Sequence, residues 1–248
     1  MDQKRLRDYA KLLARTGINV QKGEEVWIEA GLDQPEFVSM VVEACYKAGA
    51  KKVVVRWSYD KLAKLHYKYQ SVGTLSKIPP YELAKYKYMS KKFPSRLYIM
   101  SEDPDAMKGV NMMKVAKSRM KSYPKIKPFL DKCDGNYKWC IAGVPGNDWA
   151  KKVFPDLPVE EAVEKLWDAI LLTSRVDENG AVNNWNNHNS DLKAKREKLG
   201  SLNLQYLEYK ASNGTDFKVE LIKGINWGAG QEIDSQGRDF NPNIPSEE

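Results

Sequence analysis

Two adjacent carboxylates at the end of the sequence are the residues best suited to chemistry. Glu247 and Glu248 follow Asn241-Pro242-Asn243-Ile244-Pro245-Ser246, in which two prolines restrict the backbone to a stiff, extended path. Paired acids on a rigid segment are oxygen ligands that a hard or borderline divalent metal takes. Acids at a chain end are also commonly solvated, so residue type alone leaves both interpretations open.

Other residue types that do chemistry are few. The sequence has two histidines, His66 and His188, which excludes a site that needs several histidine ligands from this chain. Its three cysteines, Cys45, Cys133 and Cys140, are expected to be reduced thiols in small core positions, with an ordinary pKa. Phosphate-loop, zincin, nucleophile-elbow and paired-cysteine motifs are absent from the sequence.

One segment accounts for the net charge of +7. Residues 82–132 hold 13 lysines and arginines against 5 acids, and the rings in or beside the first part of this segment include Tyr81, Tyr86, Tyr88 and Phe93. Cations that release counterions and rings that stack on bases could bind nucleic acid. A solvated helix face gives the same pattern and is the more common case.

Strand and helix periodicities alternate along the first 200 residues. The pattern predicts strands at 25–31, 52–57, 96–100 and 137–143. It predicts helices at 4–15, 35–48, 59–69, 80–89, 111–123, 147–153, 158–173 and 181–199. The helix between the first two strands begins at Pro35 and stops at Gly49, and the unit has the length of a right-handed parallel crossover. We therefore expect residues 1–200 to form an α/β domain with a mainly parallel sheet flanked by helices.

The pattern changes after Gly200. Residues 204–210 and 216–221 are typical of short strands, and Asn213-Gly214 between them is a turn signal. A β-region of this size hardly closes a core by itself. We therefore expect residues 201–248 to be the incomplete start of a second, mostly β (α+β) domain, with apolar side chains left open to association.

The sequence also bears on location. No apolar run approaches the ~18 residues of a membrane span, so no membrane partner is expected. The first residues have the pattern of an amphipathic helix and lack the apolar stretch and cleavage site of a signal peptide. Together with unpaired cysteines, this favours a cytoplasmic protein.

Long stretches spread over the whole sequence match one known family in order and spacing. They include 9–13, 17–23, 53–57, 161–167, 175–177, Trp185 with His188-Asn189, Trp149-Ala150-Lys151-Lys152-Val153-Phe154-Pro155-Asp156-Leu157-Pro158, and the terminal segment 241–248. With these stretches the chain resembles the M29 family of thermophilic metallo-aminopeptidases (aminopeptidase T, aminopeptidase S and PepS-like enzymes).

The resemblance implies an activity and a cofactor. The family removes N-terminal residues from peptides with two divalent ions, cobalt or zinc, which activate a water between them. Family members form homodimers. The resemblance assigns the first metal-ligating glutamate to Glu248, with Glu247 as its neighbour and alternative.

The resemblance also implies that much of the site is missing. Family members continue past the position of Glu248, and their remaining ligands (a glutamate, histidines and an aspartate) and an active-site tyrosine lie in that later part. The chain corresponds to roughly the first three-fifths of a family member, and a zinc site takes about four ligands. We therefore expect a polypeptide truncated by a frameshift, a split gene or design, which is inactive alone unless a C-terminal fragment complements it.

Two alternatives from other classes stay open. The chain could be a non-catalytic α/β module kept for binding or dimerisation. The less favoured alternative is a nucleic-acid binder that uses the lysine-rich segment 82–132.

Overall fold

A five-stranded parallel sheet lies at the centre of the structure, a computed structural model that describes residues 2–101 and 103–246. Its strands are β1 (Glu25–Gly31), β2 (Lys52–Ser58), β3 (Ser95–Met100), β4 (Trp139–Gly143) and β9 (Asn243–Ile244). The order across the sheet is β2-β1-β3-β4-β9, and every neighbouring pair is parallel. The predicted α/β class is confirmed, and its first four strands lie where the sequence pattern predicts them.

One face of the sheet carries the main core. The elements on this face are α1 (Gln3–Leu12), the π-helical turn η1 (Leu13–Gly17), α2 (Pro35–Ala48), α7 (Asn147–Val153) and α8 (Val159–Thr173). Alternate strand residues such as Val26, Ile28 and Ile99 point into it and are fully buried. Gly49 ends α2 at φ 116°, a left-handed conformation that glycine adopts without a Cβ clash.

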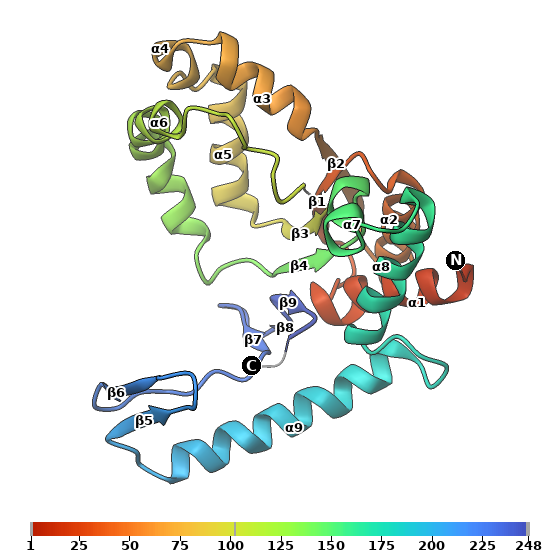
Figure 1. Cartoon of the computed structure of the whole chain (residues 1–248), viewed down its shortest axis with the longest axis vertical. Coiled ribbons are helices and arrows are strands. Elements are labelled where there is room, and N and C mark those ends of the chain that lie inside the picture. Colours follow the sequence, from red (N-terminus) through yellow and green to blue (C-terminus); the bar gives the residue numbers. More distant parts are fainter. Residues whose placement is uncertain (1, 102, 247–248) are drawn as a thin grey trace.

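A helical arm covers part of the opposite face (Figure 1). It contains α3 (Asp60–Tyr69), α4 (Val72–Leu75), α5 (Pro80–Lys92) and α6 (Met112–Cys133). A smaller core of Trp27, Met89 and Cys133 joins the arm to the sheet. The helix predicted at 111–123 is longer in the structure, where α6 runs through Pro124 and Pro128 to Cys133. No described helix is both long and apolar enough for a membrane span.

The long helix α9 (Ala181–Ser201) leads away from the sheet, and an antiparallel hairpin lies at its far end (Figure 1). The hairpin is β5 (Tyr206–Lys210) paired with β6 (Asp216–Glu220), in the region where the sequence predicts two short strands. Tyr206 and Phe217 are half exposed on it. Association through these side chains stays a prediction.

After the hairpin the chain returns to the sheet. A short antiparallel pair, β7 (Glu232–Ile233) with β8 (Asp239–Phe240), precedes β9, which pairs with the edge of β4. The stretch 201–248 therefore contains a hairpin away from the sheet and a segment built into the sheet. The domain boundary at residue 200 stays a prediction.

Candidate functional site

The segment before the two terminal glutamates is hydrogen-bonded to η1 and to strand β4. The backbone N–H of Asn241 donates to the carbonyl of Gly17 at 2.9 Å, and Ile141 donates to the carbonyl of Pro242 at 2.7 Å. Ile244 is 1% exposed and packs in the main core. Because β9 is parallel to β4, the segment leads toward the edge of the sheet where the strands end. Ligands commonly bind at this edge in open α/β sheets.

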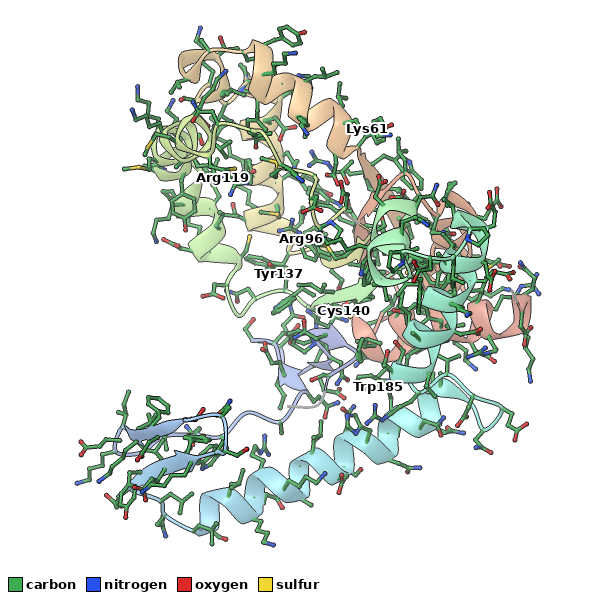
Figure 2. All side chains as sticks on the ribbon, in the orientation of Figure 1. Lys61, Arg96, Arg119, Tyr137, Cys140 and Trp185 are labelled. Carbon is green, nitrogen blue, oxygen red and sulfur yellow. The ribbon has the colours of Figure 1, made fainter. Side chains whose placement is uncertain are left out.

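The terminal segment can pack here because residue 17 is a glycine, beside which side chains of β4 and β9 lie close to the backbone. A Cβ on Gly17 would lie 3.0 Å from Cys140 Sγ and 3.5 Å from Ile244 Cδ1. Residue 17 thus has almost no room for a side chain between β4 and β9. Figure 2 labels Cys140 on β4 and Trp185 near the start of α9, with the terminal strands drawn between them.

Helix α9 holds the segment from the other side through a pair of amides. Asn189 Nδ2 donates to Asn241 Oδ1 at 3.1 Å, and Asn241 Nδ2 donates to Asn189 Oδ1 at 2.9 Å. Asn241 is fully buried and Asn189 nearly so. Each amide satisfies the other, which removes the cost of burying polar groups.

His188, on the same helix, holds the end of the segment. Its Nε2 lies 2.6 Å from the carbonyl oxygen of Ser246. A carbonyl only accepts, so Nε2 carries the proton and donates it. The ring stands edge-on to buried Trp185, with centroids 5.4 Å apart. Nε2 of His188 is therefore engaged by the backbone and does not face a metal.

A cluster of charged side chains ties residues 234–238 to Glu24, the residue before β1. Lys138 Nζ, on a fully buried side chain, donates to Glu24 Oε2 at 2.9 Å, and Arg238 Nη1 donates to Glu24 Oε1 at 2.6 Å. Arg238 also donates to Asp234 through Nε at 2.7 Å. Burial lowers the pKa of Lys138, an effect that Glu24 opposes. Burial acts to raise the pKa of Asp234, but hydrogen bonds from Arg238 outweigh it and the pKa lies below its usual value.

The two predicted ligands, Glu247 and Glu248, lie outside the described residues. His66 and His188 are not brought together: His66 is exposed on α3 and contacts Gln70, while His188 faces Ser246. The sequence therefore identified the segment that carries the acids, and the structure adds the residues that hold it.

A hollow lined by four aspartates and by Lys61 and Lys64 lies at the carboxyl ends of β1, β2 and β3. It has a volume of about 180 Å³, and its lining includes Asp33, Asp60, Asp103 and Asp148. Burial raises the pKa of Asp60, and the charges of Asp103 and Asp33 act in the same direction. Across residues 2–101 and 103–246, no three His, Cys, Asp or Glu side chains form a group that could hold a metal ion. The described part of the chain thus does not fit a complete metal site.

The three cysteines are free and buried, in line with the prediction of reduced core thiols. The expectation of an ordinary pKa is wrong, because burial raises the pKa of all three thiols, that of Cys45 to about 12. A buried thiolate would lose its hydration, which disfavours the charged form.

Three of the four rings named for the basic segment contact other side chains of the protein, whereas Tyr81 is 72% exposed. Tyr86 and Phe93 contact the core of Trp27, Met89 and Cys133. Tyr88 stacks on Trp27 with centroids 6.0 Å apart and donates to Glu25 at 2.7 Å. Rings held in this way are not free platforms for stacking bases.

Comparison with known proteins decides the family. The model of the family described as thermophilic metalloprotease (M29) matches residues 2–248. The chain belongs to the M29 metalloprotease family. Similar relatives are aminopeptidase PepS of Streptococcus thermophilus, 36% identical over 250 residues, and aminopeptidase AmpS of Bacillus subtilis, 31% identical over 247 residues. Each match covers 98% of this chain.

A solved M29 structure shares the fold. The wild-type AmpT structure from Thermus thermophilus matches with a TM-score of 0.87 at 31% identity and covers 99% of this chain. This M29 chain spans about three-fifths of its relatives: 59% of PepS and 60% of AmpS and AmpT. The resemblance inferred from the sequence is confirmed.

Sequence reasoning missed how two of the matching stretches meet. Residues 185–189 and 241–246 both carry the resemblance, yet Asn189 and Asn241 lie 52 positions apart. Isolated polar residues carry no periodicity that predicts a pair. The available signal was the presence of both stretches in one family pattern.

Proposed function

We propose that this chain is the part of an M29 metallo-aminopeptidase that holds the first metal-binding glutamate in position. The family match through residue 248 carries the proposal, and the aminopeptidase names of the relatives support it. Peptides would be the substrates. Two divalent ions, cobalt or zinc, would supply an activated water when bound.

The chain's own residues would act by positioning. Asn189 pairs with the side-chain amide of Asn241 and His188 holds the backbone of Ser246, both in the segment that ends in Glu247 and Glu248, and β4 aligns this segment along the sheet. Glu248 is our assignment for the ligand, with Glu247 as the alternative. A ligand on an anchored backbone loses less conformational freedom when it binds.

We further propose that the chain alone is inactive. The described residues offer no group of three donor side chains, and a zinc site takes about four ligands. The missing ligands would come from a second polypeptide, such as a complementing C-terminal fragment. Homodimerisation and a cytoplasmic location belong to the same proposal, and the free cysteines agree with the latter.

A non-catalytic binding or dimerisation module is the second candidate. The observation that favours it is the well-filled core around the five strands, which the described residues form by themselves. Such a module would fold and associate without any metal.

A hybrid enzyme tests the proposal. Residues 1–248 are joined to the part of S. thermophilus PepS that lies beyond its match to this chain, and hydrolysis of a leucine anilide is measured with Co²⁺ or Zn²⁺ and with a chelator. We expect chelator-sensitive turnover that Glu248→Gln lowers by about two orders of magnitude or more. Glu197→Gln, on an exposed residue of α9, is the matched control and should leave the rate unchanged. A folded hybrid without turnover, or one in which neither Glu248→Gln nor Glu247→Gln matters, would contradict it.

A further inference from the structure

A hollow lies on the sheet face that the helical arm covers only in part. It has a volume of about 350 Å³, and its lining includes Glu29, Arg56, Tyr98 and Met100. Strand alternation places Glu29, Arg56 and Tyr98 on the same face as Trp27, which packs under α5 and α6. Figure 2 labels Arg96 at β3, beside this part of the sheet.

The hollow lies where the order of the strands reverses. The chain passes from β1 to the neighbouring β2 and then crosses to β3 on the other side of β1. The last residues of β2 and β3, Ser58 and Met100, both line the hollow. In open parallel sheets, ligands bind at the carboxyl ends of the strands at such a reversal.

Arg56 brings an unused hydrogen-bond donor to this place. Its Nη2 lies 3.5 Å from Glu82 Oε1, but its buried Nη1 has no partner among the residues that the structure describes. A guanidinium is always charged, and a buried N–H without an acceptor is costly. The side chain is 37% exposed, and Arg56 is one of the residues that line the hollow.

The residues beside Arg56 in the hollow indicate the charge and the polarity of the ligand that it could bind. Glu29 is the register partner of Arg56 on β1 and accepts from Arg96 at 2.9 Å. The charged residues that line the hollow are one cation, Arg56, and one anion, Glu29. Because Glu29 would repel a doubly charged phosphate, this lining favours a ligand with a single negative charge. The Tyr98 ring and the 40% exposed Met100 offer an apolar surface beside Arg56.

We propose that this hollow binds a small monocarboxylate with an apolar body of about amino-acid size. Arg56 receives the carboxylate, and Tyr98 and Met100 contact the apolar body. None of residues 241–246 lines this hollow, and the proposed binding does not depend on a metal.

Two probes that differ only in charge test the proposal on the 248-residue chain. N-acetyl-phenylalanine carries the carboxylate, and N-acetyl-phenylalaninamide has the same body without it. We expect calorimetric or NMR titration to detect the acid and to find the amide weaker by about tenfold or more. Arg56→Met should weaken the acid by a similar factor, whereas Arg119→Met, on an exposed residue of α6, should not.

Three results would overturn the proposal. They are no binding of the acid at millimolar concentration, equal binding of acid and amide, and unchanged binding in a folded Arg56→Met variant. If Arg56→Met does not fold, Arg56→Lys replaces it. Lysine keeps the positive charge but lacks the planar guanidinium, so this variant should weaken binding of the acid less than removal of the charge would.

Discussion

His188 Nε2 and the carbonyl oxygen of Ser246 lie 2.6 Å apart, although 58 positions separate them in the sequence. The contact joins the first part of α9 to the last described residue before the two terminal glutamates. Since Nε2 donates, the imidazole acts as a backbone anchor. His188 thus holds the backbone of Ser246, the last residue of the terminal segment that the structure describes.

Replacing His188 should loosen the terminal segment. His188→Ala removes the donor to Ser246, and a typical hydrogen bond contributes about 0.5–1.5 kcal/mol. We expect faster amide hydrogen exchange across residues 241–246, with the sheet strands β1 and β3 unchanged. His188→Gln, whose amide N–H can still donate, should restore part of the protection.

His66→Ala is the matched control, because His66 is exposed on α3 and contacts Gln70 alone among the hydrogen bonds described for its ring. It should leave exchange in 241–246 as in the parent chain. Equal exchange in His188→Ala and the parent would show that the imidazole does not hold the segment.

The side-chain amides of Asn189 and Asn241 should contribute to the free energy of unfolding as a coupled pair. Asn189→Ala leaves the amide of Asn241 buried without a partner, which costs about 1–3 kcal/mol. Removing both amides should cost less than the sum of the two single changes. Urea unfolding of the single and double variants measures this, and exposed Asn186→Ala serves as control. Strictly additive losses would refute the pairing.

A methyl group at residue 17 should disturb the junction between β4 and β9. Gly17→Ala puts a Cβ 3.0 Å from Cys140 Sγ and should cost about 1–3 kcal/mol of unfolding free energy. Adding Cys140→Ala should recover part of the loss. Gly200→Ala, with no atom within 4 Å, should instead stabilise α9 by up to about 1 kcal/mol. Thermal unfolding of the variants separates these outcomes.

The contacts of Asp234 in the charged cluster predict how the free energy of unfolding changes with pH. Hydrogen bonds from Arg238 overcome burial and keep the pKa of Asp234 below its usual value, so the folded state favours the carboxylate. This contribution is complete above the unfolded pKa of about 3.9 and is lost as pH falls through the lower folded value. Asp234→Asn should therefore lose less stability than the parent between about pH 5 and pH 3.

The urea midpoint at several pH values measures this difference. Asp216→Asn is the control, because its side chain is 73% exposed and lies 3.9 Å from Lys210. If the urea midpoint of Asp234→Asn changes with pH as that of the parent does, the hydrogen bonds from Arg238 do not cause the loss of stability in acid.

Most of the fold could be predicted because local patterns encode it. The β-branched run at 52–57 and the apolar face between Pro35 and Gly49 specify a strand and a helix without reference to the rest of the chain. Strand β9 could not be predicted in this way. It consists of two residues that lie between prolines. It is a strand because it pairs with β4, which lies about a hundred positions earlier in the sequence.

The candidate site was predictable only in part for the same reason. Paired acids after two prolines mark the terminal segment, but its anchors are single residues on other elements. The His188, Asn189 and Gly17 contacts depend on how α9, η1 and β4 meet, and no spacing along the sequence encodes those contacts.

Turnover by the purified 248-residue chain decides whether this chain is inactive alone. The assay is leucine-anilide hydrolysis with Co²⁺ or Zn²⁺, with a chelator control and circular dichroism to verify folding. We expect a folded chain whose rate equals that of the chelated sample, because the described residues hold no group of three donor side chains and a zinc site takes about four ligands. Chelator-sensitive turnover by this chain alone would contradict it.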